Sequence, residues 1–240
     1  MGWESIKVPD GTMRLYVSRP EGAGSFPGVI VIQGQKGVDR FIEEVTERLA
    51  REGYVAAGPE LYHRDPADCR DDAKTRRARL RDRLVIQDVN AAADFLARDP
   101  KVDAARLGIM GFCMGGRVTL LMSSAGPRFK AGSDFYGGNI FEPWGEGPSP
   151  FQRAAGIHCP VMGHFGLEDE NPSPADIKKL DGELTRLGKP HEFFSYEKTG
   201  HAFMDSHGDK YRAESAAKAW TRTMEFFGRQ LAPAKSRAAS

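Results

Sequence analysis

The sequence predicts an α/β fold, with a mainly parallel sheet that is covered by helices on both faces. Short continuous apolar runs, such as residues 28–33 (GVIVIQ) and 107–112 (LGIMGF), are typical of strands buried on both faces. Segments with helical periodicity alternate with these runs from residue 28 onward, which indicates right-handed crossovers between parallel strands. The length of 240 residues allows one such domain with a substantial core.

The N-terminal segment has a different pattern, which predicts a β-hairpin over residues 3–18. Ile6 and Val8 alternate with polar neighbours, and Asp10-Gly11 supplies a turn. The alternation resumes after the turn, so we expect two antiparallel strands that are buried on one side.

The remaining elements follow from apolar runs, helical periods and the turns between them. Asp39 is suited to cap a helix that runs to Gly53. The further predicted strands are 28–33, 54–57, 107–112, 130–136, 161–165 and 192–196. The predicted helices are 39–53, 84–98, 116–123, 174–187 and 211–227. We assign residues 1–230 to a single domain, and residues 231–240, which are small, basic and proline-containing, to a flexible C-terminal tail.

Residues 64–83 are rich in arginine and aspartate and poor in apolar residues. This composition is typical of a solvated loop and helix. The alternative is that some of these side chains line a substrate pocket.

Composition excludes several classes of partner. Lys and Arg number 34 against 33 Asp and Glu, so there is no strong positive field for nucleic acid or an anionic membrane. No apolar run approaches the length of a membrane span, and Met1-Gly2-Trp3-Glu4 does not begin a signal peptide. Three cysteines are too few and odd in number for a disulfide framework. We therefore expect a cytoplasmic enzyme without membrane or nucleic-acid partners.

Cys113 is the candidate nucleophile. It lies in Gly111-Phe112-Cys113-Met114-Gly115, between a buried strand and a helix. This is the G-x-nucleophile-x-G turn with cysteine in place of serine, and its glycines allow a strained strand-to-helix turn. The helix N-terminus that follows favours a thiolate. Cys69 and Cys159 lack this setting and are interpreted as structural.

Two further predicted strand ends supply the partners of the nucleophile. Asp169 follows the strand 161–165 and can orient a histidine, with Glu168 as the poorer candidate. His201 follows the strand 192–196 and can act as the base. The order nucleophile, acid, histidine is that of the α/β-hydrolase fold. The other histidines have no comparable setting.

An acyl-transfer site also needs donors for the oxyanion. We expect the backbone N–H of Met114 and that of Gln35, in the loop after the first buried strand, to supply them. No metal-ligand spacing and no glycine-rich phosphate loop is present, so we expect neither a metal nor a cofactor.

The chain resembles the dienelactone hydrolase family (carboxymethylenebutenolidases) from about residue 3 to residue 230. The segments that carry the resemblance are VIVIQGQKGVDRFI, GYVAAGPELYHR, GIMGFCMGG, HFGLED and GHAF. The resemblance implies a single α/β-hydrolase domain with a Cys–His–Asp triad. These roles fall on Cys113, His201 and Asp169, and the oxyanion donors on the backbone of Gln35 and Met114.

The sequence departs from the family pattern at two substrate-facing positions. The family has a glutamate that contacts the resting thiol where this chain has Gly34, and an arginine that binds the substrate carboxylate where it has Asp205. An arginine of residues 76–83 is a candidate replacement for that carboxylate contact.

The leading hypothesis is a hydrolase that cleaves small-molecule esters or lactones through an acyl-enzyme on Cys113. One alternative keeps the site but acts as a promiscuous carboxylesterase, thioesterase or phosphotriesterase with little dienelactone activity, since Asp205 would repel anions. Another is a non-catalytic binding protein with the same fold. A monomer and a homodimer are both compatible with the sequence.

Overall fold

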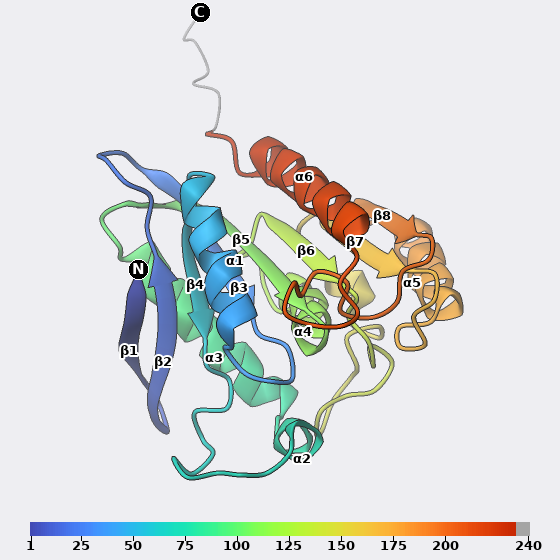
Figure 1. Cartoon of the computed structure of the whole chain (residues 1–240), viewed down its shortest axis with the longest axis horizontal. Coiled ribbons are helices and arrows are strands. Elements are labelled where there is room, and N and C mark those ends of the chain that lie inside the picture. The colour runs from blue at the N-terminus through green and yellow to red at the C-terminus, as the bar shows by residue number, and fades with distance from the viewer. Residues whose placement is uncertain (234–240) are drawn as a thin grey trace, which may run out of the picture.

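The computed structural model describes residues 1–233. Its strands form a single eight-stranded sheet (Figure 1). The strand order across the sheet is β1-β2-β4-β3-β5-β6-β7-β8. The strands are β1 (Gly2–Val8), β2 (Gly11–Ser18), β3 (Phe26–Ile32), β4 (Val55–Pro59), β5 (Val102–Phe112), β6 (Ala131–Phe135), β7 (Val161–Gly166) and β8 (His191–Tyr196). The pairs β1–β2 and β2–β4 are antiparallel and the others are parallel, so the predicted α/β class is confirmed.

Helices cover both faces of this sheet. On one face lie α1 (Arg40–Arg51) and α6 (Ala213–Gln230), and on the other lie α3 (Asp82–Ala97), α4 (Met114–Ser124) and α5 (Pro174–Arg186) (Figure 1). Two short helices, α2 (Ala73–Ala78) and the 3₁₀ helix η1 (Ala154–Gly156), lie in the connections. Asp39 caps α1 as predicted, because its side chain accepts a hydrogen bond from the backbone N–H of Ile42.

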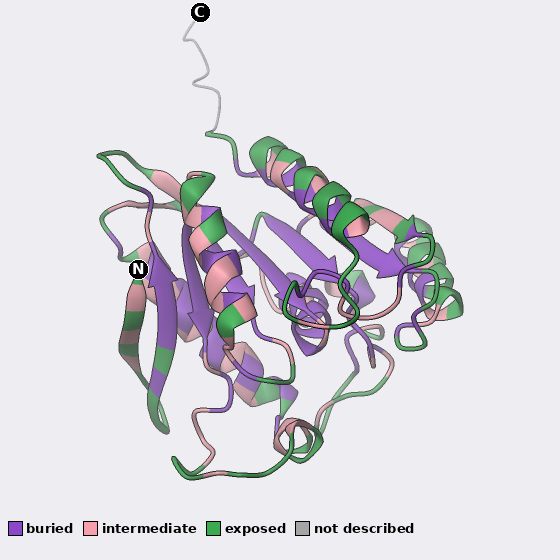
Figure 2. Ribbon diagram, in the orientation of Figure 1, coloured by how far each residue is buried: buried purple, intermediate pink, exposed green. Residues whose placement is uncertain are grey.

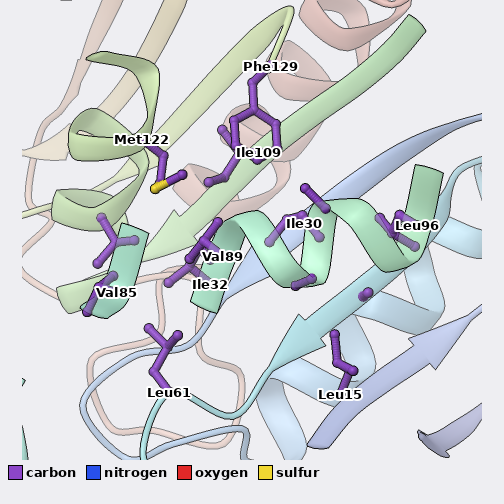
Figure 3. Close-up of a cluster of buried hydrophobic side chains, with 14 of the residues drawn as sticks. Leu15, Ile30, Ile32, Leu61, Val85, Val89, Leu96, Ile109, Met122 and Phe129 are labelled. Atoms are coloured by element: carbon purple, nitrogen blue, oxygen red, sulfur yellow. The ribbon is translucent and has the colours of Figure 1, made fainter. Parts of the chain in front are cut away.

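Strand β3 is apolar throughout because each of its two faces packs against a helical layer. In β3, Ile30 and Ile32 belong to the cluster beneath α3 and α4, whereas Val29 and Val31 belong to the cluster beneath α1 and α6. Figure 3 shows part of the first cluster. Strands β4, β6 and β7 are buried along their length, and β3 and β5 are buried toward their carboxyl ends (Figure 2). The chain thus places the carboxyl ends of β3, β5, β7 and β8 at one edge of a rigid sheet.

Some element boundaries differ from the prediction. β5 begins at Val102 rather than at residue 107, because Val102 pairs with Phe26 of β3 before a register shift. α4 begins at Met114 rather than at Gly116, since glycines that weaken a helix in isolation are needed here for close packing. α6 begins at Ala213 and continues to Gln230.

The predicted C-terminal tail begins one residue too early. Leu231 is buried and packs against Gly108, so it belongs to the core beneath α6. Residues 234–240, which make up most of the predicted tail, lie outside the described part of the chain. In residues 1–233, no helix combines the length and the apolar character that crossing a bilayer requires.

Candidate active site

Cys113 occupies a sharp turn between the last residue of β5 and the first residue of α4. Its backbone has φ 56° and ψ −118°, a conformation that is costly for a residue with a Cβ. A Cβ at Gly111 would lie 2.1 Å from the carbonyl oxygen of Gly115, and a Cβ at Gly115 would lie 2.3 Å from that of Ile32. The flanking glycines are therefore required by close backbone contacts, and the predicted strand–turn–helix setting is present.

The Cys113 thiol is surrounded by groups that favour its charged form. Burial acts to raise the pKa of the thiol, but the hydrogen bond with His201, its charge, and the backbone N–H groups of Met114 and Gln35 lower it more. The net result is a pKa below that of an ordinary cysteine. The two N–H groups that lower the thiol pKa are the pair expected to bind an oxyanion.

The His201 imidazole connects the thiol to Asp169. Its Nδ1 lies 2.8 Å from Oδ2 of Asp169, whose side chain is only 3% exposed. Burial would lower the pKa of His201, but the interactions with Asp169 and Cys113 outweigh it and raise the pKa to about 9. Both pKa shifts have the direction expected for a thiolate beside an imidazolium. Glu168 is exposed, whereas the neighbouring Asp169 is the acid that reaches the histidine.

Asp169 is itself held by a loop contact that the sequence analysis missed. Its Oδ1 accepts the backbone N–H of Asn171 at 2.9 Å, and the side-chain oxygen of Asn171 accepts the N–H of Asn139 at 3.0 Å. A Cβ at Gly138 would lie 2.5 Å from that side-chain oxygen, so a glycine is needed for the approach. The Asp-x-Asn spacing is a weak signal for such a turn, and its long-range partner could not be predicted.

Tyr62 positions the expected oxyanion donor at Gln35. Its hydroxyl donates a hydrogen bond to the carbonyl oxygen of Gln35 at 3.1 Å and lies 3.4 Å from Sδ of Met114. Since the hydroxyl fixes the peptide group between Gln35 and Lys36, next to the one that carries the Gln35 N–H, it limits the path of the loop after β3. Tyr62 is the second site residue that the sequence analysis did not identify.

A cavity of about 550 Å³ opens beside Cys113 and His201. Its polar and charged lining includes both acids next to Asp169 and several cations. The lining residues are Gln35, Arg77, Cys113, Met114, Arg117, Gly138, Asn139, Trp144, Glu168, Asp169, Glu170, Asn171, Gly200, His201, Lys210 and Arg212. This volume is suited to a small molecule.

The two predicted substrate-binding positions differ in their placement. A Cβ at Gly34 would lie 3.9 Å from the Cβ of Cys113, so position 34 faces the nucleophile and leaves space there. Asp205 is not among the residues that line the cavity, and its role as a substrate contact stays a prediction. Its carboxylate lies 3.4 Å from Nζ of Lys36 and accepts the backbone N–H of His207, because the loop after His201 turns it toward the loop after β3.

Residues 64–83 are in part a solvated segment and in part a lining of the cavity, which are the two alternatives that the sequence left open. Helix α2 has no buried residue, as expected for a solvated segment, yet Arg77 lines the cavity. Arg76 and Arg79 instead bind Asp65, and Arg81 donates to backbone carbonyl groups. Asp82 is buried, which the polar composition of the segment did not indicate.

The other cysteines lie outside the cavity lining. Cys159 is buried, and burial raises the pKa of its thiol. Cys69 is half-buried in the loop before α2. Within residues 1–233, no three His, Cys, Asp or Glu side chains are grouped so that they could hold a metal ion.

Comparison with known proteins finds relatives that match nearly the whole chain. The family model described as "Dienelactone hydrolase family" matches residues 13–231. A Methylorubrum extorquens protein named "Putative carboxymethylenebutenolidase" is 35% identical over 92% of this chain and 79% of its own length. A Synechocystis protein with the same name is 31% identical over 94% of this chain and 96% of its own length.

Solved structures give the same fold. One from Klebsiella pneumoniae subsp. pneumoniae, named "Putative Dienelactone Hydrolase", superposes with a TM-score of 0.89 at 33% identity and covers 95% of this chain and 98% of its own. The "Dienelactone Hydrolase-like Promiscuous Phospotriesterase P91" has a TM-score of 0.79 at 23% identity, with 96% and 99% coverage. At that identity the second likeness concerns the fold alone.

Proposed function

Because the chain belongs to the dienelactone hydrolase family and is a hydrolase of carboxylic ester bonds, we propose that it cleaves small-molecule esters or lactones through an acyl-enzyme on Cys113. The observation that carries this proposal is that Cys113, on the turn before α4, lines one cavity together with His201, whose Nδ1 lies 2.8 Å from Asp169. A group so placed can attack a carbonyl carbon while the oxygen remains bound.

In the first half of the reaction, the thiolate of Cys113 attacks the carbonyl carbon and a C–S bond forms. The electron pair of the carbonyl moves onto oxygen, where the N–H groups of Gln35 and Met114 stabilise it. When the intermediate collapses, the C–O bond to the leaving group breaks and the His201 imidazolium gives its proton to the alkoxide. A lactone keeps this alcohol attached to the acyl group.

In the second half, water resolves the thioester. Neutral His201 removes a proton from the water, the hydroxide attacks the acyl carbon, and the C–S bond breaks to return the thiolate. Asp169 keeps Nδ1 of His201 protonated, so that Nε2 serves the reacting groups. The products are a carboxylic acid and an alcohol, or one hydroxy acid from a lactone.

The charges at the cavity bear on the choice of substrate. Arg77 forms no ion pair with any side chain of residues 1–233, so its guanidinium can bind a substrate carboxylate. Asp205, whose predicted repulsion motivated a preference for neutral esters, is directed toward Lys36 instead. We therefore favour substrates with a carboxylate that reaches Arg77.

Mass spectrometry after rapid acid quenching with p-nitrophenyl acetate tests the proposal. An acetyl adduct on Cys113, with release of phenolate, is the expected result. Cys159→Ala should retain the adduct, and Cys113→Ala should lose it. If the wild type forms no adduct and releases no phenolate, a binding protein with this fold becomes the better interpretation.

A further inference from the structure

Trp144 contributes an aromatic surface to the cavity that the proposed mechanism does not use. It lies in the loop between β6 and η1, is half-buried, and lines the same cavity as Cys113 and His201. Part of its side chain packs against the core cluster beneath α3 and α4. Further contacts hold its backbone and its ring.

Asp82, at the start of α3, binds the backbone of Trp144 in both directions. Its Oδ2 accepts the N–H of Trp144 at 3.0 Å, and its own N–H donates to the Trp144 carbonyl at 2.8 Å. Asp82 is 2% exposed, so water competes little for these bonds. The pair of bonds fixes where the indole leaves the loop.

Arg117 fixes the ring. Its guanidinium carbon lies 3.9 Å from the ring centroid of Trp144, and its side chain has no exposed surface. Nη1 and Nη2 bind the two carboxylate oxygens of Asp82 at 2.7 and 3.0 Å. Nη2 also donates to the carbonyl of Glu142 and Nε to that of Asn139.

This arrangement excludes one role for Arg117 and favours another. Although Arg117 borders the cavity, all three of its guanidinium nitrogens are bound within the protein, so it is not available for a substrate anion. Burying a charged pair costs desolvation that apolar side chains would avoid. A buried pair one helical turn from Cys113 is better explained by positioning than by stability.

We infer that Trp144 is a specificity residue, whose indole binds an aromatic group of the ester substrate while Arg117 and Asp82 hold the ring in place. The inference rests on the proposed function. Arg117 covers part of the indole, another part packs against the core cluster beneath α3 and α4, and Trp144 also lines the cavity. A flat, immobile ring offers offset stacking to an aromatic group, beyond the apolar contact that it offers to a saturated ring.

Two matched ester pairs test the inference. Methyl benzoate and methyl cyclohexanecarboxylate differ on the acyl side, and phenyl acetate and cyclohexyl acetate differ on the alcohol side. We expect Trp144→Leu to lower the aromatic-to-saturated ratio of kcat/KM by about tenfold in one pair, the size of a stacking contact. Trp144→Phe should lose less.

Trp3→Ala is the matched control, since Trp3 lies in β1, stacks against Arg14 of β2 and is not part of the cavity lining. It should leave both ratios unchanged. Leucine keeps an apolar side chain against Arg117, and thermal unfolding establishes that the variant is folded. A parallel fall for all four esters, or unchanged ratios in both pairs, would overturn the inference.

A binding measurement separates this inference from the proposed function. In the Cys113→Ala background, calorimetric titration with all four esters gives the aromatic preference of each pair without turnover. Loss of that preference in Cys113→Ala/Trp144→Leu supports the role of Trp144 even if the wild type hydrolyses none of the esters. Preferences that survive the substitution overturn it, whatever the fate of the proposed function.

Discussion

Two histidines near the carboxyl ends of the neighbouring strands β7 and β8 have pKa values that are shifted in opposite directions. His164 lies in β7 and is fully buried, with Nδ1 2.9 Å from the Tyr196 hydroxyl and Nε2 2.9 Å from that of Thr223. Burial, assisted by the charge of Arg222, lowers the pKa of His164 to about 3. His201, just after β8, has its pKa raised to about 9 by Asp169 and Cys113 against the effect of burial.

The difference shows that partners, not position, decide the protonation of a buried imidazole. Arg222 donates to the Tyr196 oxygen and Thr223 donates to a backbone carbonyl. Tyr196 can therefore donate to Nδ1 of His164, and Nε2–H can donate to Thr223. Two neutral hydroxyls thus satisfy a neutral ring, whereas a carboxylate and a thiolate require a charged one. His164 is a structural residue and His201 is the candidate base.

The largest expected effect is on the nucleophile. Cys113→Ala should lose at least about a thousandfold in kcat for p-nitrophenyl acetate, because no other group can form the acyl-enzyme. Cys159→Ala should leave kcat nearly unchanged. Near-normal turnover by Cys113→Ala would show that the charged histidine serves another nucleophile.

Replacing Asp169 should lower the pKa of His201, so that its imidazole becomes neutral at a lower pH, as that of His164 does. Asp169→Asn removes the carboxylate that raises the pKa of His201, and we expect kcat to fall about a hundredfold. An NMR titration should place the His201 midpoint near 9 in the wild type and lower in the variant. If the midpoint does not move, the 2.8 Å contact does not control the charge.

His164 should matter for stability and not for turnover. His164→Asn leaves hydroxyls of Tyr196 and Thr223 without their partner and should cost about 1–3 kcal/mol of unfolding free energy at pH 7. Since burial holds the pKa of His164 below its unfolded value, its stabilisation is present above pH 6.5 and is lost as pH falls toward 3.

Urea unfolding at several pH values checks this sign. The deficit of His164→Asn relative to the wild type should shrink between pH 6.5 and 4.5. A deficit that grows on acidification would mean that His164 is charged in the folded protein. A loss of kcat at full stability would place it in the catalytic machinery instead.

The smallest effect concerns the resting thiol. Gly34→Glu should slow alkylation of Cys113 by iodoacetamide several-fold near neutral pH, since a carboxylate beside the sulfur raises the thiol pKa. The wild-type midpoint should lie below that of free cysteine, about 8.5. A Cβ at position 34 would meet only ordinary van der Waals contacts, so the substitution makes no clash at the Cβ.

Gly34→Gln is the matched control because it has the same shape without the charge. Equal slowing by both variants would indicate obstruction of the cavity. A wild-type midpoint at or above that of free cysteine would contradict the ion pair with His201.

What the sequence predicts well is local or sterically forced. The apolar run of β3 reflects two covered faces, and the glycines around Cys113 reflect clashes of 2.1–2.3 Å that follow from the turn itself. The acid and the histidine could be placed because parallel strands end at a common edge. To place these two residues, it is enough to know where each strand ends and in which direction it runs.

What it does not predict depends on side chains that meet across the fold. Arg117 and Asp82 are 35 positions apart, and nothing in a polar segment distinguishes a buried aspartate from its exposed neighbours. Asn171 and Tyr62 act through backbone groups of other loops. The contact of Asp205 with Lys36 could not be predicted either, because a family position fixes a place in the chain, while loop geometry fixes the direction of the side chain.

The glycine at position 34 also has a consequence for the lifetime of the enzyme. A thiolate that stays charged between turnovers, in an open cavity, is the form of cysteine that peroxides oxidise most readily. Neither Cys69 nor Cys159 lines that cavity, so a sulfenic acid at Cys113 has no neighbouring thiol with which to form a protective disulfide. Further oxidation to the sulfinic acid would then be irreversible. The absence of a carboxylate at position 34 thus favours a thiolate at Cys113 that reacts readily with substrate and is also readily oxidised.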